Sequence, residues 1–276
     1  MRTEPFRDAE GWELPLLQSA VIPRGFRHGF TTRAGGVSRA PFDTLNLGAK
    51  WGDARADVLE NRRRVERAAG AGPLYFATQV HGAAVAHVQA GDARADVARL
   101  EADGLCADAP AVALAVFVAD CIPALLADAR TGAFAAVHAG WRGTVAGVLP
   151  AAVRALGERY GARAADVRVA LGPAIGACCF EVGPEVVAAF EAVIPDARAA
   201  GIVLDGAGRE AGRKARIDLK LANRVLLARA GVPPEAIDLG APCTSCEEQR
   251  FYSYRRDAGR TGQHLGFIRR APPDGA

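Results

Sequence analysis

Three residues with metal-binding side chains stand at the ends of expected strands, beside small residues or turns: His81, Cys121 and His138. Two imidazoles and one thiolate make a three-ligand set with a fourth position open, which is the arrangement of catalytic zinc sites. Zinc in such a site lowers the pKa of a bound water towards neutrality and polarises the group under attack. The gaps from 81 to 121 and from 121 to 138, 40 and 17 residues, match no short metal-binding motif. A second interpretation therefore stays open, in which each side chain is simply buried and hydrogen-bonded.

Two of these residues belong to an expected β-hairpin within residues 111–143. A nearly unbroken apolar run over Ala111–Ala119 predicts a buried strand that stops at Asp120. A second apolar run, Ala133–Val137, leads into His138. The residues at 128–132 are typical of a hairpin turn.

The register of this hairpin decides whether Cys121 and His138 meet. With a four-residue loop over 129–132, Pro123 lies opposite His138, and Cys121 shares the face of Pro123 by the two-residue period of a strand. Cys121 and His138 are then diagonal neighbours, roughly 7–8 Å apart between backbones. That spacing suits two side chains that converge on one ion, whereas a slip by one residue would place them on opposite faces.

Four other cysteines form two pairs in the sequence. Cys243 and Cys246 form a CxxC motif, which is compatible with half a zinc site, a redox pair or two structural thiols. Because no second CxxC motif supplies further ligands, we expect a structural or incidental role. Cys178 and Cys179 are adjacent, so an extended chain would send their sulfurs to opposite faces, and we expect them to pack.

Several polar residues could bind substrate or position a ligand. The segment Gly172–Gly176 is not a dinucleotide fingerprint, but a glycine loop beside Arg142, or beside Arg255 and Arg256, could hold an anion such as phosphate. Pairing of these arginines with acidic neighbours is the alternative. Asn46, between two leucines, either caps a turn or reaches the site, and we place it with Arg142 among the substrate-binding candidates. A carboxylate such as Asp120 could orient a histidine ligand or simply form a turn.

Composition excludes several classes of function. The 276 residues carry 34 basic and 31 acidic side chains, a net charge of +3 without a basic tract, so we expect neither nucleic acid nor a membrane as a partner. The first residues alternate in charge and lack the apolar core of a secretory signal. By default we expect a cytoplasmic protein whose six cysteines are free thiols or metal ligands rather than disulfides.

The order of expected elements predicts a layered α/β domain. The hairpin is incompatible with a purely parallel sheet, so we expect a mixed one. Because composition is even along the chain, we expect a single catalytic domain over residues 26–276, preceded by an N-terminal docking segment over 1–25. The other expected strands are Phe26–Arg33, Leu74–Val80 and Val167–Leu171, and the expected helices are Asp53–Gly70, Thr144–Tyr160, Pro184–Val193 and Asp218–Ala230.

Several motifs, in order over about residues 26–268, resemble the YfiH family of laccase-domain proteins. This family is also described as multicopper polyphenol oxidase-like and as the peptidoglycan editing factor family. The motifs are HGFTTR at 28–33, LNLG at 45–48, ENRR at 60–63, TQVHG at 78–82, ADC at 119–121, VHAGWRG at 137–143, GPAIG at 172–176, CFEVG at 179–183 and CTSC at 243–246. Two departures concern Lys50 with Trp51, and Gln263, where relatives carry histidine and arginine; they affect the rim of the expected site.

The resemblance implies a zinc held by His81, Cys121 and His138, which are then also the catalytic residues, in a fold like that of cytotoxic necrotizing factor. It implies phosphate-dependent cleavage of adenosine, inosine, guanosine and methylthioadenosine, together with adenosine deamination. Nucleoside and phosphate are then the partners, and the oligomeric state stays unknown. Copper and laccase-like oxidation of polyphenols are less favoured, because several copper sites need more than five histidines. A zinc amidase that edits peptidoglycan precursors, and a metal-stabilised interaction module with a fourth protein ligand from Cys106 or the CxxC motif, are the other interpretations.

Overall fold

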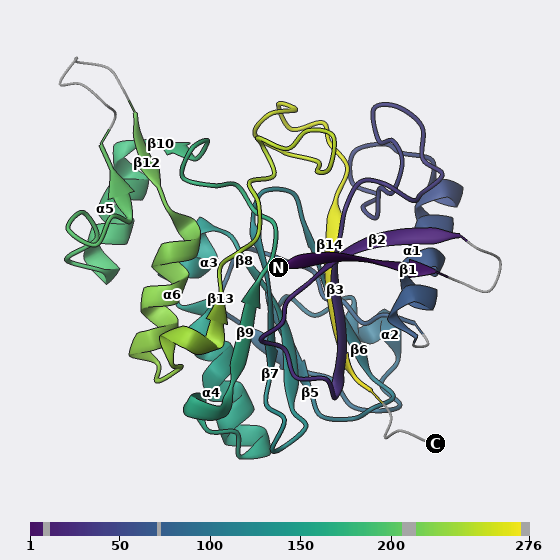
Figure 1. Cartoon of the computed structure of the whole chain (residues 1–276), viewed down its shortest axis with the longest axis horizontal. Coiled ribbons are helices and arrows are strands. Elements are labelled where there is room, and N and C mark those ends of the chain that lie inside the picture. The colour runs from purple at the N-terminus through teal and green to yellow at the C-terminus, as the bar shows by residue number, and fades with distance from the viewer. Residues whose placement is uncertain (8–11, 71–72, 206–213, 272–276) are drawn as a thin grey trace.

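Two large β-sheets pack face to face, and helices cover their outer faces (Figure 1). The computed structural model describes residues 1–7, 12–70, 73–205 and 214–271. The five-stranded sheet is antiparallel throughout and has the order β1 (Arg2–Arg7), β2 (Glu13–Gln18), β3 (Phe26–Thr31), β14 (His264–Arg270), β6 (Ala113–Val118).

The second large sheet is mixed, as the hairpin predicted. Its order is β13 (Ile237–Asp238), β9 (Arg168–Leu171), β7 (Ile122–Ala127), β8 (Phe134–Ala139), β5 (Gly104–Ala107), β4 (Val85–His87), and the two outermost pairs are parallel. A small antiparallel sheet has the order β10 (Glu181–Val182), β12 (Ala215–Ile217), β11 (Val203–Leu204). The helices are α1 (Arg55–Ala69), α2 (Arg94–Val97), α3 (Trp141–Val145), α4 (Val148–Tyr160), α5 (Pro184–Val193) and α6 (Leu219–Arg229). The chain is a single α/β domain with mixed sheets.

Strand β7 is apolar throughout because both of its faces are buried. Leu126 faces the helix-covered side of its sheet and packs with α4 and α6, whereas Leu125 faces the other large sheet. Both side chains are fully buried, so neither face of the strand requires polar residues. On the far side of the molecule, α1 covers the outer face of the five-stranded sheet through residues such as Val65.

The N-terminal segment adds two strands to the five-stranded sheet. Strand β2 pairs with β3 through Leu16 and Thr31, and β1 extends the sheet edge. Its role as a docking segment stays a prediction. In the part of the chain that the structure describes, no helix combines the length and the apolar character needed to cross a membrane.

Two expected elements differ in the structure. The helix expected over Thr144–Tyr160 is two helices, α3 and α4, separated at Gly147, which has the positive φ of 79° that glycine adopts easily. Pro150 is tolerated because it lies in the first turn of α4, where backbone N–H groups have no partner within the helix. The strand expected over Leu74–Val80 was wrong: only isolated bridges form there, and the side chain of Gln79 bonds both the N–H and the C=O of Phe117 at 2.8 Å.

Candidate metal centre and active site

The hairpin has the predicted register. Pro123 on β7 pairs with His138 on β8, and the N–H of Asp128 donates to the carbonyl of Ala133 at 2.9 Å across the turn. Cys121 stands immediately before β7. It and His138 therefore lie at the same end of the hairpin.

His81 joins these two residues from the loop before β4. One potential ligand atom from each of His81, Cys121 and His138 lies within 4.8 Å of the other two. The two imidazole rings are nearly perpendicular, with centroids 4.8 Å apart. His138 is only 3% exposed, whereas His81 is exposed to solvent. Among the described residues this group contains no fourth histidine, cysteine or carboxylate, so a metal held here would keep an open position.

A carboxylate that we did not anticipate, Asp103, positions both histidines. Its Oδ1 accepts hydrogen bonds from His138 Nδ1–H at 2.7 Å and from the N–H of His81 at 2.9 Å. Its Oδ2 accepts from the N–H groups of Val80 and Gly82 at 3.2 and 2.6 Å. With Nδ1 engaged, Nε2 of His138 is the nitrogen left to bind a metal.

The charged forms of Asp103, Cys121 and His138 stabilise one another despite burial. Burial by itself would raise the pKa of Cys121, but the neighbouring His138 and His81 lower that pKa to about 6. Burial by itself would lower the pKa of His138, but the Cys121 thiolate and Asp103 raise it to about 9. Burial likewise opposes ionisation of Asp103, yet His138 and the N–H of Gly82 hold its pKa below the usual range. Near pH 7 these shifts favour a Cys121 thiolate paired with a His138 imidazolium, so the thiolate is ready to bind a metal and His138 gives up its Nε2 proton when a metal binds.

Gly140, which directly precedes α3, leaves the space that the three ligands occupy. A Cβ atom at this position would lie 2.9 Å from Sγ of Cys121 and 3.0 Å from Cδ2 of His81. Its φ of −76° is open to any residue, so only this close approach requires glycine.

A cavity of about 470 Å³ opens onto the three ligands, a volume within the usual range for small-molecule sites. Aromatic rings from Trp51, Phe117 and Tyr254 line it, and Arg142 and Lys50 contribute positive charge. The rings of Trp51 and Tyr254 lie 5.9 Å apart. The cavity therefore offers apolar planes and cationic groups beside the candidate metal centre.

The two substrate-binding candidates differ in position. Arg142 lines the cavity, with its guanidinium carbon 4.3 Å from the ring centre of Trp141. Asn46 is 1% exposed and is not among the residues that line the cavity. Its Oδ1 accepts from the N–H of Gly48 at 3.0 Å and from the N–H of Gln263 at 2.9 Å. Because Gln263 lines the cavity, Asn46 reaches the site through that residue.

The side-chain hydrogen bonds of Asp120 go to loops rather than to a histidine ligand. It has a φ of 80°, and its carboxylate accepts from the hydroxyl of Thr244 at 2.6 Å, the hydroxyl of Ser253 at 3.0 Å and the N–H of Arg255 at 2.7 Å. The carboxylate that orients a histidine is Asp103. A buried acid just before a short strand was the available signal, but nothing local in the sequence connects it to His138.

The packing role expected for Cys178 and Cys179 holds for Cys179, which is partly buried and packs against the core, and was wrong for Cys178. Cys178 is exposed, and both residues lie beside Cys243 and Cys246 in one cluster. Cys106 is buried separately, with its sulfur 4.0 Å from the hydroxyl of Tyr160. In the described part of the chain, neither Cys106 nor the CxxC motif approaches the His81 site as a fourth ligand.

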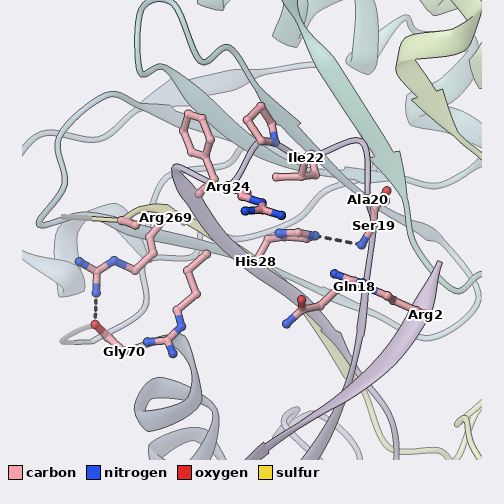
Figure 2. A pocket seen from close by; sticks show the side chains of 13 residues that line it. Arg2, Gln18, Ser19, Ala20, Ile22, Arg24, His28, Gly70 and Arg269 are labelled. Carbon is pink, nitrogen blue, oxygen red and sulfur yellow. Dashed lines mark hydrogen bonds between the residues drawn. The ribbon is translucent and has the colours of Figure 1, made fainter. Parts of the chain in front are cut away.

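A larger cavity, of about 600 Å³, lies beside β3 and contains none of the three ligands (Figure 2). Arginines at 2, 24, 27 and 269 line it together with His28. Nε2 of His28 accepts from the N–H of Ser19 at 3.0 Å, and Arg269 donates to the carbonyls of Gly70 and Pro110. His28 and Arg269 thus hold surrounding backbone in place. The smaller cavity is therefore the candidate active site, because it contains the three possible metal ligands.

Comparison with known proteins shows the family and the fold. A family model described as multi-copper polyphenol oxidoreductase laccase matches residues 27–271. The chain belongs to this family. It is similar to the purine nucleoside phosphorylase YlmD of Geobacillus stearothermophilus, with 39% identity over 96% of both chains, and to the purine nucleoside phosphorylase of Deinococcus radiodurans, with 42% identity over 92% of both. The crystal structure of the hypothetical protein YfiH of Bacillus licheniformis matches with a TM-score of 0.84 at 33% identity, covering 95% of this chain and 98% of that one.

Proposed function

We propose that this chain is a zinc-dependent purine nucleoside phosphorylase that also deaminates adenosine. The observation that carries the proposal is the cluster of His81, Cys121 and His138 at a cavity lined by aromatic and cationic side chains. The names of the relatives, purine nucleoside phosphorylases at 39% and 42% identity, support the same reaction. Adenosine, inosine, guanosine and methylthioadenosine are the proposed nucleosides.

The donor set fits zinc. Imidazole nitrogen and thiolate sulfur are ligands that zinc prefers, and Asp103 leaves Nε2 of His138 directed away from the carboxylate. Zinc with one open position supplies Lewis-acid polarisation and activates water when bound. Copper is less favoured, since two of the five histidines, His28 and His264, are buried and accept backbone N–H groups instead.

The chain's own residues divide the remaining tasks. Phe117, Trp51 and Tyr254 provide flat apolar surfaces for the purine base. Arg142, with Lys50 on the same cavity, binds the phosphate whose oxygen attacks the anomeric carbon of ribose as the glycosidic bond breaks. The leaving base takes the bonding electron pair, and the proton it gains balances the one that hydrogen phosphate gives up. In deamination, water attacks the purine C6 carbon and ammonia leaves.

Asn46 contributes to substrate binding indirectly in this proposal. Its Oδ1 accepts the N–H of Gln263 and so fixes a residue of the cavity wall. The same oxygen accepts the N–H of Gly48 and so holds the loop that leads to Lys50 and Trp51. Asp103 keeps the proton on Nδ1 of His138 and so fixes the tautomer that presents Nε2.

The test incubates metal-quantified protein with adenosine, with and without phosphate, and separates the products by chromatography. We expect adenine only when phosphate is present, and inosine in both samples. His81→Ala should lose the metal of this site and both products, whereas His87→Ala, a histidine outside the cavity, should retain them. Undiminished turnover by His81→Ala that has lost the metal of this site would overturn the mechanism. No turnover by protein with stoichiometric zinc would refute the nucleoside proposal, and a peptidoglycan precursor would then be the next substrate.

A further inference from the structure

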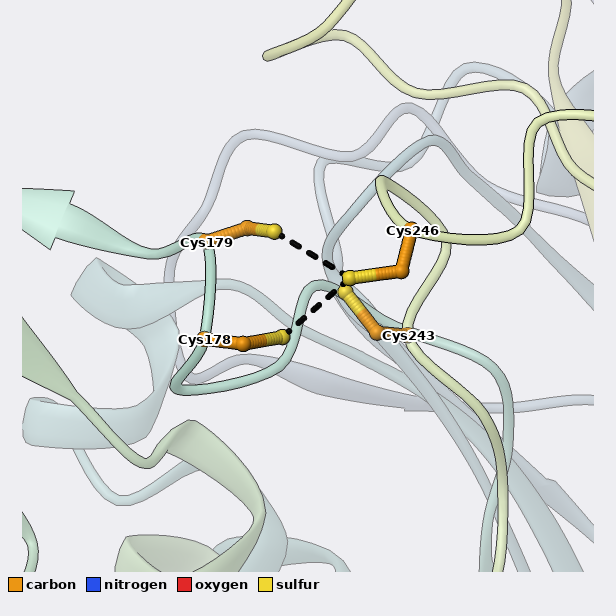
Figure 3. A group of neighbouring side chains, drawn as sticks. All are labelled: Cys178, Cys179, Cys243 and Cys246. Carbon is orange, nitrogen blue, oxygen red and sulfur yellow. Dashed lines mark hydrogen bonds between the residues drawn. The ribbon is translucent and has the colours of Figure 1, made fainter.

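Four cysteines from two distant loops meet outside the active site (Figure 3). Cys178 and Cys179 lie between β9 and β10, and Cys243 and Cys246 lie between β13 and β14. Strands β9 and β13 are parallel neighbours in the sheet, so the loops that follow them emerge at the same edge. This topology brings together residues that are more than sixty positions apart.

The four sulfurs converge on one point. All four Sγ atoms lie within 4.8 Å of one another, and Cys246 Sγ is 3.4 Å from the Sγ atoms of both Cys178 and Cys179. Sulfurs in a disulfide are about 2.05 Å apart, so these are separate thiols. Zinc–sulfur bonds of about 2.3 Å in a tetrahedron place the sulfurs roughly 3.8 Å from one another. The observed spacing brackets that value and requires movements of about 1 Å or less.

We propose that Cys178, Cys179, Cys243 and Cys246 form a second metal site, which holds zinc through four thiolates and ties the two loops together. Each thiol gives its proton to solvent as the ion binds, and no electron is transferred. Cys178 and Cys246 are exposed, which leaves the ion a route into the cluster. The evidence for this second site does not depend on the proposed nucleoside reaction.

The backbone around the cysteines is arranged for sulfur ligands. The N–H of Gly176 donates to Cys243 Sγ at 3.1 Å, a contact that stabilises a thiolate. A Cβ atom at Gly176 would lie 3.2 Å from Sγ of Cys178, so a larger residue would crowd the cluster. The N–H of Thr244 donates to the carbonyl of Ala174 at 3.1 Å and joins the two loops directly.

Nearby positive charge offsets the net charge of −2 that zinc with four thiolates carries. Lys220 donates to the carbonyl of Ala241, and its ammonium interacts electrostatically with Cys243 and Cys178. Arg255 donates to the carbonyls of Cys179 and Glu181 at 3.3 and 2.9 Å. These two cations therefore partly neutralise the negative charge that zinc with four thiolates would carry.

The site has a structural consequence for the active site. The two loops that carry the cysteines also hold Asp120, which precedes Cys121. The N–H of Ile175 donates to the carbonyl of Asp120 at 2.9 Å, and the hydroxyl of Thr244 donates to its carboxylate. A metal between these loops would brace the turn that presents Cys121.

The experiment counts metal in purified full-length protein reconstituted with Zn²⁺ under reducing conditions. We expect two equivalents of zinc in the parent, one in His81→Ala and one in the double variant Cys178→Ser/Cys246→Ser. Cys106→Ser, which alters a buried cysteine outside both clusters, should retain two. Unchanged zinc content in the double variant would overturn the proposal, as would a single equivalent in the parent that disappears in His81→Ala.

Cobalt substitution of His81→Ala gives a second readout that does not depend on folding of the double variant. With its four cysteines intact, this protein should bind one Co²⁺ and show the strong sulfur-to-cobalt charge-transfer absorption of a tetrathiolate. Zn²⁺ should also protect four thiols of His81→Ala from alkylation by N-ethylmaleimide until a chelator is added. Absence of the cobalt band, or recovery of the four cysteines as disulfides from reduced protein incubated with Zn²⁺, would refute the site.

Discussion

Asp103 and His138 are joined by two hydrogen bonds, one between side chains and one between backbones. Asp103 Oδ1 accepts from His138 Nδ1–H at 2.7 Å, and the carbonyl of Asp103 accepts from the N–H of His138 at 2.7 Å. The same carboxylate binds the N–H groups of residues 80–82. One side chain thus sets both the loop of His81 and the ring of His138.

Replacing this carboxylate tests its positioning role. Asp103→Asn presents an amide to several donors, so it loses charge and at least one hydrogen bond while the backbone contact to His138 remains. We expect zinc affinity to fall by about 10- to 100-fold. Competition with a chromogenic chelator measures the affinity, and Asp96→Asn, an exposed acid on α2, is the control. Equal affinities of the two variants would contradict the role of Asp103.

Gly140→Ala probes the site without straining the backbone. The added Cβ would crowd Cys121 Sγ and His81 Cδ2 at about 3 Å. Overpacking of this kind costs about 1–3 kcal/mol, and we expect zinc affinity to fall by about 5- to 150-fold. Gly25→Ala is the matched control, because a Cβ there has no atom within 4 Å. Metal titration with parental affinity in Gly140→Ala would show that the ligands do not need this space.

The hairpin could be predicted because its information is local. The turn at residues 128–132 fixes the register, and the register places Pro123 opposite His138. The apolar run over Ala111–Ala119 also forms a strand, β6, but that strand lies in the other large sheet and not in the hairpin. The signal for the end of α1 was equally local. Gly70 ends the helix with a φ of 60°, and its N–H donates to carbonyls of the last turn.

The features that the sequence did not reveal depend on contacts between distant segments. Asp103 acts by binding the backbone of residues 80–82, which leaves no pattern in the sequence. The cysteine cluster depends on the parallel pairing of β9 and β13, a contact between strands almost seventy residues apart. Adjacent Cys178 and Cys179 direct their sulfurs to one place because they lie in a turn, not in an extended strand.

Arg142 should govern phosphate binding. Loss of a charge-assisted hydrogen bond costs about 1.5–3 kcal/mol, so we expect Arg142→Ala to raise the KM for phosphate by about 10- to 150-fold. Deamination of adenosine, which uses no phosphate, should change by less than about twofold. Arg154→Ala, an exposed arginine on α4, is the control. Initial rates over a phosphate series measure both variants, and an unchanged KM for phosphate would assign the anion to another residue.

Stability should decrease in mild acid because His28 and His264 are buried. Burial is the main cause that lowers the pKa of His28 to about 4 and that of His264 to about 3. In the unfolded chain both pKa values return to about 6.5. Between about pH 4 and pH 6.5 these histidines take up protons in the unfolded chain but not in the folded protein. The free energy of unfolding therefore falls as the pH drops below about 6.5. Each histidine should cost about 2 kcal/mol at pH 5 relative to pH 8.

Urea unfolding of the parent and of His264→Gln at both pH values isolates the contribution of one histidine. Glutamine retains an acceptor for the N–H of Tyr252, which Nε2 of His264 accepts at 2.7 Å. The decrease in the free energy of unfolding from pH 8 to pH 5 should be about 2 kcal/mol smaller in the variant than in the parent, whatever the variant's stability at pH 8. Comparing each protein with itself cancels the titration of carboxylates, which both share. A pH-dependent difference equal to that of the parent would mean that His264 does not stay neutral in the folded protein.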